Sequence, residues 1–480
     1  TSTRRTSMKL AVLMTLTLAS TAHADVLSNT TTKQFFLGKV ETGEMPKGMA
    51  TTNDGKLLYV ADMAGRKITP EGRYEGNLTI IDIDRVKLHR ILKTPTGPRP
   101  RTLGNIEVEM TEDGRYALVT RMEGCGPGGE TCPEKYKPSE SLPYPMVFAI
   151  DTRTEEIVKM IPTKKAGLEG GDGPKVIKIR PMISPSIGYV ANYFSNDLTI
   201  MDLERLSSTP VIDTAGERIK GLVKLSTTHV DSKGRKRIAP RGIAFTSDGR
   251  HALVMGAESN SLFVVDAIEH KQIAELAAPT DSINFRHVVT NKAGTIAYIS
   301  HMHGNAISRI DIPRLLQIAR RQSTGGESVS LPAATWKEIL IPFPTAKSGF
   351  LVLEEYPLDH PTFPGQKYKK AEPNTIVLDP VNERYLYVSF RTAGLNYDGI
   401  NDNQMTPMNQ KGKVDIVDLE RGVVVKSLIG GVEPTALAVT PDNRVLMSSG
   451  FRDNQIYFFD LAKILSMYEA QDGRVLIGRR

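Results

Sequence analysis

The stretch 239–266, APRGIAFTSDGRHALVMGAESNSLFVVD, contains three short runs of strand-forming residues separated by turn residues. The first run follows Pro240 and leads into Ser247-Asp248-Gly249, where the glycine can take a positive φ at little cost. A second turn separates the middle run from the third run, 262–265, which ends on Asp266. The stretch therefore predicts one antiparallel meander of three strands.

The same pattern recurs at six other places in the chain. A unit of short strands that cannot bury its own apolar faces, repeated this often, is typical of a β-propeller. We therefore predict an all-β fold, a seven-bladed β-propeller of four-stranded antiparallel blades with loop insertions concentrated on one face. The other six copies are 49–82, 102–151, 174–202, 285–311, 373–418 and 434–460.

Each copy ends on an aspartate. We interpret these residues as turn caps rather than catalytic acids, because a carboxylate at a strand end accepts hydrogen bonds from the backbone of the turn that follows. They are Asp82, Asp151, Asp202, Asp266, Asp311, Asp418 and Asp460.

The segment Tyr189-Val190-Ala191-Asn192, followed by Asn196 and an apolar run into Asp202, closely resembles the YVTN-type repeat of exported bacterial propellers. The resemblance covers nearly all of the chain after residue 24 and implies the propeller architecture. For function it implies less. Members of this family are frequently interaction modules, some seven-bladed relatives are lactonases or lactonising enzymes, and similar propellers of periplasmic nitrite reductases bind haem. One propeller scaffold carries many unrelated activities, so all three classes stay open.

Residues 1–24 are predicted to be a cleaved signal peptide. The segment 8–24, MKLAVLMTLTLASTAHA, has a basic start, an apolar run too short to span a bilayer, and a small-residue end that places cleavage before Asp25. Arg4-Arg5 loosely resembles a twin-arginine signal, and a translation start at Met8 is the alternative. The rest is then a single propeller domain, periplasmic or secreted, with no transmembrane segment after cleavage. It spans 25–480, with insertions at 121–145, 206–238, 312–371 and 392–411.

The last blade needs a fourth strand from elsewhere in the chain. The segment 34–42, QFFLGKVET, resembles an outer strand without its first three, so we expect it to complete the blade that begins at Pro434. Such closure removes open sheet edges that invite aggregation. The tail 474–477 is the alternative source. The insertion 312–371 is expected to contain an amphipathic helix and one outer strand.

Cys125 and Cys132 lie in a glycine- and proline-rich insertion, GCGPGGETCPEKYKP. Their spacing does not match the close pairs of zinc or haem-attachment motifs. An oxidising periplasm favours a disulfide between them, and two free thiols are the alternative.

The formal net charge of +7 includes three cations that signal cleavage would remove. No polybasic run or aromatic-basic motif accompanies this charge, so the composition predicts no nucleic-acid partner.

Cations recur at one position of the repeat, directly after the proline that precedes the innermost strand or at its equivalent. Five of the seven residues at this position are basic. Equivalent positions in radial blades point the same way, so these side chains are expected to ring the mouth of the central channel. A ring of this kind suits a carboxylate, a phosphate or an acidic protein surface. Pairing of each cation with a carboxylate, or exposure to water, is the alternative. The seven residues are Lys47, Arg101, Lys175, Arg241, Arg286, Asn374 and Thr435.

Histidines and methionines add to the predicted site. His287 follows Arg286 and is assigned to the same ligand-binding set. In SHMHGN, between the second and third strands of one blade, alternation would point two histidines the same way. A soft-ligand pair in NQMTPMNQ suits copper, although loop histidines and packing methionines are the alternative. The candidate metal ligands are His301, His303, Met405 and Met408.

No cofactor is required by the sequence, and noncovalent haem or copper stays open. The loop 396–403 lacks the ligand spacing of an EF-hand calcium site.

The sequence thus predicts an exported propeller that binds an anionic small molecule or a partner protein through its basic channel mouth and decorated loop face. One alternative is a lactonase or lactonising enzyme, in which Arg241, Arg286 and His287 bind a carboxylate and move a proton. The other is a redox-associated propeller that holds haem or copper. No nucleophile elbow, phosphate-binding glycine loop or metalloprotease helix is present in the sequence, and whether the chain is an enzyme stays open.

Overall fold

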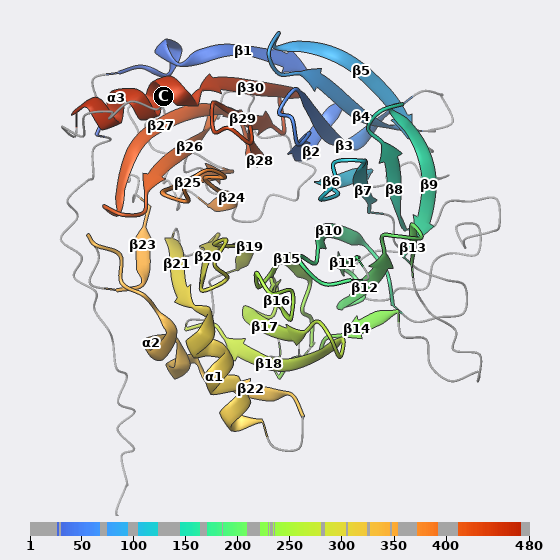
Figure 1. The fold of residues 1–480 in the computed structure, drawn as a ribbon, viewed down its shortest axis with the longest axis vertical. Coiled ribbons are helices and arrows are strands. Elements are labelled where there is room, and N and C mark those ends of the chain that lie inside the picture. Colours follow the sequence, from blue (N-terminus) through green and yellow to red (C-terminus); the bar gives the residue numbers. More distant parts are fainter. Residues whose placement is uncertain are drawn as a thin grey trace, which may run out of the picture.

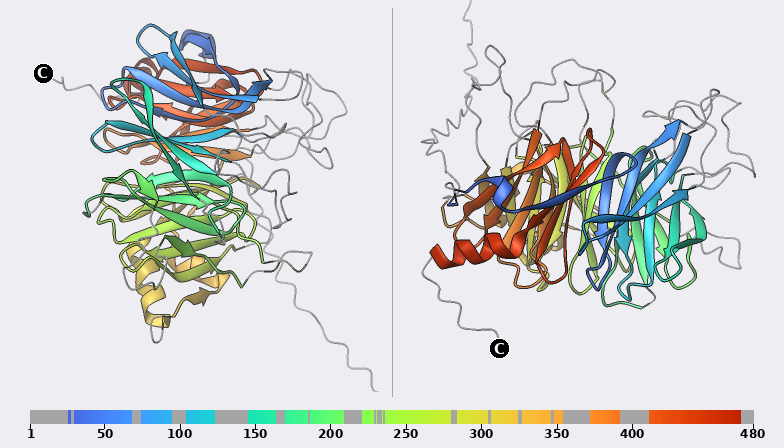
Figure 2. Two further views of the ribbon diagram at one scale, coloured as in Figure 1. Left: turned by 90° about the vertical axis from the view of Figure 1, so that its right-hand side faces the viewer. Right: turned by 90° about the horizontal axis from the view of Figure 1, so that it is seen from above.

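The computed structural model is a ring of seven antiparallel sheets around a central axis, which confirms the predicted all-β, seven-bladed propeller (Figure 1). Figure 2 shows the ring from the side, with the strands running across the thickness of a disc. The structure describes residues 26–27, 30–67, 74–94, 104–122, 145–163, 170–184, 186–208, 221–228, 230, 234, 236–279, 284–303, 306–323, 327–345, 348–353, 372–391 and 411–471.

The first three strands of each blade run outward from the axis in chain order. The innermost strands are β2 (Glu44–Thr51), β6 (Asn105–Met110), β10 (Pro174–Ile179), β15 (Pro240–Phe245), β19 (Phe285–Thr290), β24 (Pro373–Leu378) and β28 (Pro434–Val439). The second strands are β3 (Leu57–Lys67), β7 (Tyr116–Arg121), β11 (Ile187–Asn192), β16 (His251–Gly256), β20 (Ile296–His301), β25 (Tyr385–Phe390) and β29 (Val445–Gly450). The third strands are β4 (Tyr74–Asp82), β8 (Met146–Asp151), β12 (Asp197–Asp202), β17 (Ser261–Asp266), β21 (Ala306–Asp311), β26 (Lys411–Asp418) and β30 (Gln455–Asp460).

The outer strands vary more than the inner three. In the third blade the outer strand is split, so the insertion 206–238 contains strand residues of that blade. The fourth blade gains a fifth strand, β22 (Val329–Leu331), which pairs in parallel with the outer strand. The outer strands are β5 (Lys87–Thr94), β9 (Glu156–Pro162), the pair β13 (Ser207–Ser208) and β14 (Leu222–Lys224), β18 (Lys271–Ala277), β23 (Phe350–Val352), β27 (Val423–Val432) and β1 (Phe36–Glu41).

The apolar core lies between the blades. Among the described residues it forms seven clusters, each shared by two successive blades, so the clusters close a ring. The alternation of side chains along a strand explains this arrangement. In β3, Leu58 and Val60 pack against the seventh blade, whereas Tyr59 and Ala61 pack against the second. Both faces of a blade are therefore buried, which is why the second strands read as continuous apolar runs.

The N-terminal strand closes the ring. β1 pairs antiparallel with β30 and places Val40 opposite Ile456, as we predicted for the segment 34–42. It follows a short 3-10 helix, η1 (Thr32–Gln34). The alternative source, 474–477, lies outside the described residues.

The insertion 312–371 contains both elements that we expected. The helix α1 (Ile312–Gln322) is capped by Asp311, whose side chain accepts a hydrogen bond from the Arg314 backbone N–H. The strand β23 is the outer strand of the fifth blade. The helix α1 and the strand β22 of this insertion lie at the rim beside β18 (Figure 1). It also holds η3 (Ala333–Thr335) and α2 (Trp336–Ile339), and the chain's last described helix is α3 (Leu461–Gln471). Within the described residues, no helix has the length and apolar character needed to cross a membrane.

The aspartates that end the third strands cap the turn that follows, as predicted, except Asp311 and Asp460, which cap the first turns of α1 and α3. Each accepts a hydrogen bond at 2.8–3.0 Å from a backbone N–H two or three residues later. Asp418 also pairs with Arg384 at 2.7 Å. These carboxylates stabilise the face opposite the starts of the inner strands, so they are structural.

Candidate functional site

Every inner strand begins with a break in its pairing to the second strand. In β2 the register shifts between Pro46 and Gly48, and in β15 it shifts between Pro240 and Gly242. The residue between them, Lys47 or Arg241, leaves the hydrogen-bonding ladder. Such bulges re-aim a side chain, here into the channel.

A left-handed residue precedes nearly every bulge. Met45, Ala239, Asn284 and Glu433 have φ of 59°, 51°, 48° and 56°, a conformation that costs energy in most residues other than glycine. Strained backbone that recurs at equivalent positions requires support from the surrounding structure, and it clusters at functional sites. The repeat therefore holds the residues at the channel mouth in a fixed orientation.

Hydroxyl groups of the second strands supply part of that support. Thr120 Oγ1 accepts a hydrogen bond from the Glu107 N–H at 3.1 Å and donates to the Lys175 carbonyl at 2.7 Å. Ser300 Oγ does the same between the His287 N–H, at 3.0 Å, and the Asn374 carbonyl, at 2.8 Å. Each hydroxyl thus ties the bulge of one blade to the inner strand of the next.

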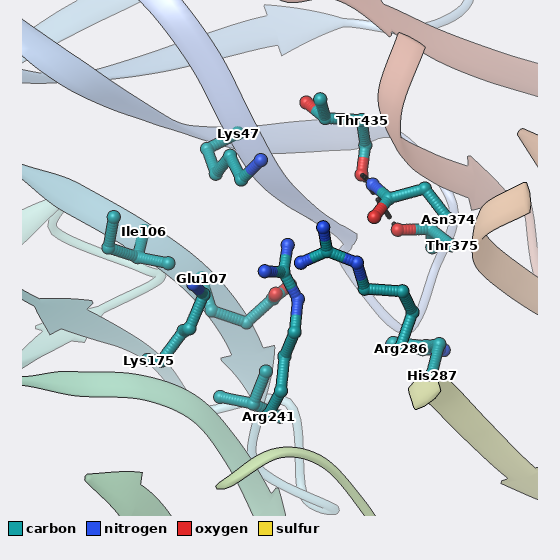
Figure 3. Close-up of a pocket in the computed structure, with 11 residues that line it drawn as sticks. Lys47, Ile106, Glu107, Lys175, Arg241, Arg286, His287, Asn374, Thr375 and Thr435 are labelled. Carbon is teal, nitrogen blue, oxygen red and sulfur yellow. Dashed lines mark hydrogen bonds between the residues drawn. The ribbon is translucent and has the colours of Figure 1, made fainter. Parts of the chain in front are cut away.

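These side chains surround one pocket in the central channel (Figure 3). Lys47, Arg241 and Arg286 point toward the space that the inner strands enclose. The volume open to the centres of water-sized molecules is about 30 Å³, enough for roughly two waters. The lining carries four cationic side chains and one carboxylate, that of Glu107.

The structure brings together six of the seven residues predicted for the channel mouth and places a different residue in the second blade. Arg101 lies outside the described residues, and the equivalent position belongs to Ile106. The alignment used the proline before the inner strand as its marker. In the second blade Asn105, which pairs with Arg121, takes the place of that proline directly before the bulge. The ring consists of Lys47, Ile106, Lys175, Arg241, Arg286, Asn374 and Thr435, and we call it the channel ring.

Three cations of the channel ring contact uncharged side chains: two aromatic rings and one methionine sulfur. Lys47 Nζ lies 4.8 Å from the centroid of the Phe451 ring, and Lys175 Nζ lies 4.1 Å from that of Tyr193. Arg286 Nε donates to the sulfur of Met302. Phe451, Tyr193 and Met302 each directly follow the second strand of a blade, a position that the sequence analysis did not consider.

The same cations have no carboxylate partner in the described part of the chain. Lys47, Lys175, Arg241 and Arg286 form no ion pair there, whereas Lys178, deeper in the channel, pairs with Glu109 at 2.6 Å. Burial, together with the positive charge of Arg241, holds the pKa values of Lys47, Lys175 and Arg286 well below their usual range. Burial also lowers the pKa of Arg241 to about 10.

Glu107 and His287 line the same pocket, and burial favours the uncharged form of each. Burial raises the pKa of Glu107 to about 7, although Lys178 acts in the opposite direction. Burial lowers the pKa of His287 to about 3, helped by Lys178 and Arg241. The Nδ1 atom of His287 has no hydrogen-bond partner in the described residues. His287 is therefore a neutral polar group at this site.

Acidic residues also lie close to the channel ring, directly before two inner strands. Glu433 pairs with Arg391, and with Arg452 at 2.8 Å. Burial opposes ionisation of Glu433, but the two arginines lower the pKa of this carboxyl below its usual range. Burial raises the pKa of Glu372 against the effect of Arg391. Both glutamates directly precede the proline that begins an inner strand. They lie two residues before the channel-ring position, so the alignment of the repeats could have found them.

The predicted metal ligands do not come together in the described residues. His301 is buried, donates or accepts a hydrogen bond with Ser308 at 2.8 Å, and packs edge-on against Phe285 and Trp336. His303 is exposed two residues further on. Among the described residues, no group of three or more His, Cys, Asp and Glu side chains could hold a metal ion. Met405, Met408, Cys125, Cys132 and the loop 396–403 lie outside the described residues.

Comparisons with known proteins show the fold and a short stretch of sequence similarity. No protein-family model matches the chain. Antigen Lp49 of Leptospira interrogans is 39% identical over 85 residues, which span 18% of this chain and 18% of that relative. A chain of Kuenenia stuttgartiensis hydrazine synthase aligns with a TM-score of 0.51 at 16% identity, over 87% of this chain and 96% of that one. The Myceliophteria thermophila Cps50 (Swd1) β-propeller domain aligns with a TM-score of 0.52 at 13% identity, over 89% and 99%. The chain is therefore a β-propeller that is similar to both structures in fold.

Proposed function

We propose that this chain is a binding protein that captures an anionic group in the channel ring. The observation that carries the proposal is that, in the described part of the chain, partly buried cations pair with aromatic rings and a thioether instead of carboxylates. Cations that repel one another in a partly desolvated place create a strong positive potential. A bound anion would reduce that repulsion and would accept hydrogen bonds from the arginines.

The rigidity of the site also supports a binding function. The left-handed residues and the hydroxyl bridges of Thr120 and Ser300 hold the cations in place before a ligand arrives. A preorganised site loses less entropy on binding than a flexible one. The geometry therefore supports capture of a ligand without rearrangement of the inner strands.

Export to the periplasm or out of the cell, as a YVTN-type propeller, is part of the same proposal. It rests on the sequence of residues 8–24 and on the repeat at 189–202. A partner protein that offers an acidic side chain to the channel ring is compatible with it.

The lactonase and haem alternatives receive less support from the described pocket. Its volume of about 30 Å³ accommodates a small anionic group, whereas sites for drug-sized ligands usually provide roughly 300–1,000 Å³. A general base works best with a pKa near the working pH, and His287, with a pKa of about 3, is far from that condition. Binding is the function that these residues favour.

Isothermal titration calorimetry at low ionic strength, with phosphate, sulfate, malonate and acetate, tests the proposal. We expect at least one of these anions to bind, and Arg241→Gln and Arg286→Gln each to weaken it at least about tenfold, because a hydrogen bond to a charged group contributes about 1.5–3 kcal/mol. Arg85→Gln is the charge-matched control, since its side chain is 80% exposed on the opposite face. Absence of binding by every anion, or equal affinities in all three variants, contradicts the proposal.

A further inference from the structure

We infer that the anionic group is a doubly charged tetrahedral oxyanion of the phosphate class, an inference that rests on the function proposed above. Four features of the channel ring lead to it: the directions of its donors, its charge, its size and its rigidity.

The donors come from four different blades. Lys47 lies on β2, Lys175 on β10, Arg241 on β15 and Arg286 on β19, so their side chains reach the pocket from separate sectors of the ring. A carboxylate offers two oxygens in one plane and is well matched by a single arginine fork. A tetrahedral oxyanion offers oxygens in four directions, and it can contact cations that surround it.

The charge of the pocket favours an anion with more than one negative charge. Four cationic side chains line it with one carboxylate, and the raised pKa of Glu107 leaves that carboxylate partly protonated near pH 7. A monoanion would leave several cations uncompensated in a partly buried place, where like charges repel strongly. A dianion compensates more of them at no additional cost in volume.

The size of the pocket limits the ligand to a compact head group. The open volume of about 30 Å³ holds roughly two water molecules, which is in the range of a phosphate or sulfate group and far below that of a nucleotide or a sugar. Any organic part of the ligand must therefore extend along the channel, away from the cations.

The rigidity of the donors turns this match into selectivity. The bulges at Pro46–Gly48 and Pro240–Gly242 and the left-handed Met45 and Ala239 fix the directions from which Lys47 and Arg241 approach. Preorganised donors bind the shape that they surround and gain little from a planar anion of equal charge.

The test is a titration series on the full chain at constant ionic strength, above the second pKa of phosphate. Phosphate and sulfate are expected to bind at least about tenfold more tightly than malonate, a dicarboxylate of the same charge, and than acetate. Malonate binding as tightly as sulfate would overturn the tetrahedral assignment and leave the proposed function standing. Failure of all four anions would overturn both.

Two further measurements sharpen the result. Arg286→Lys keeps the charge and removes the planar fork, so it should weaken phosphate at least about tenfold while circular dichroism stays unchanged. Unchanged phosphate affinity in this variant would count against a contact with Arg286. Glycerol phosphate in the same series shows whether the ligand is a free inorganic ion or the phosphate group of an organic ester. The ester binds as tightly as the free ion only when the channel admits its organic part. Tight binding of free phosphate supports a tetrahedral oxyanion whether or not glycerol phosphate also binds.

Discussion

Lys175 and Tyr193 form a cation–π pair in which the ammonium nitrogen lies 4.1 Å from the ring centroid. The Tyr193 hydroxyl donates to Glu258 Oε1 at 3.0 Å, so the ring that supports Lys175 is itself fixed. Glu258 also pairs with Arg237 at 2.9 Å. A chain of three contacts thus positions one cation of the channel ring from the space between the third and fourth blades.

Replacing Tyr193 by leucine should weaken anion binding without unfolding the chain. The variant removes the aromatic face under Lys175, and a partly desolvated cation–π contact contributes about 1–2 kcal/mol, which corresponds to a loss of about 5- to 30-fold in affinity. Calorimetric titration with sulfate measures the change. Tyr193→Phe is the matched control, because it keeps the ring and removes only the hydroxyl. Equal losses in both variants would show that the hydroxyl, and not the ring, positions Lys175.

Anion affinity should rise as the pH falls through about 7. Glu107 has a pKa of about 7 in the pocket, so protonation below that pH removes the one negative charge among the described residues of the lining. His287 stays neutral throughout this range, since its pKa is about 3. We expect sulfate, which does not titrate here, to bind roughly three- to tenfold more tightly at about pH 6 than at about pH 8.

The variant Glu107→Gln isolates this effect. It should bind sulfate tightly at both pH values and lose the pH dependence, because the amide carries no charge. The neighbouring ion pair of Lys178 and Glu109 is retained in the variant. A pH dependence that persists in Glu107→Gln would assign the titration to another group: to Glu372, whose pKa burial raises, or to Lys47 or Lys175, whose pKa values burial lowers.

The architecture could be predicted from local signals because each blade repeats them. Four of the seven inner strands begin with a proline, and β2 has Pro46 as its third residue. The third strand of each blade ends on an aspartate, and the apolar runs between these markers have the length of strands. The same local reasoning assigned the ring position of the second blade to Arg101, whereas the structure places Ile106 there. The bulges of the second and fifth blades follow Asn105 and Phe285 instead of a proline, so the proline at position 100 was a misleading marker.

The contacts of the site depend on the closed ring and could not be derived from spacing. Arg391 and Glu433 are 42 residues apart and meet only because the sixth and seventh blades are adjacent. Alternation was expected to point His301 and His303 the same way, but β20 ends at His301, and alternation applies only within a strand. The cations could be found from the repeat, whereas their aromatic partners follow from packing between blades.

The free energy of unfolding should fall as the pH rises, because of the buried carboxyl of Asp62. Its side chain is 0% exposed, its Oδ2 accepts from Thr79 at 2.8 Å, and burial raises its pKa from 3.8 to about 8. Because the folded-state pKa lies above the unfolded value, the stabilising contribution is fully present below about pH 4 and is lost as the pH rises toward 8. Relative to Asp62→Asn, the wild type should lose about 1.4 kcal/mol of unfolding free energy per pH unit in that window.

Urea unfolding at several pH values measures this difference. Asp54→Asn is the control, because the hydrogen bond from Thr52 lowers the pKa of that exposed carboxyl and reverses the sign of the effect. A constant difference between wild type and Asp62→Asn from about pH 4 to about pH 8 would show that Asp62 titrates normally.

Two adjacent phenylalanines test the closure of the ring. Phe35 is 1% exposed and packs with Leu461 and Leu465 of α3 in the cluster between the sixth and seventh blades, whereas Phe36 is 39% exposed on the outer strand. Phe35→Ala should lower the unfolding free energy by about 3–5 kcal/mol, the usual cost of removing a buried aromatic side chain. Phe36→Ala should cost about 1–2 kcal/mol, because much of its ring already contacts water. Urea denaturation of the two variants compares them directly. If the two losses are equal, Phe35 is not the residue that anchors the N-terminal segment, and closure depends on the backbone pairing of β1 with β30 alone.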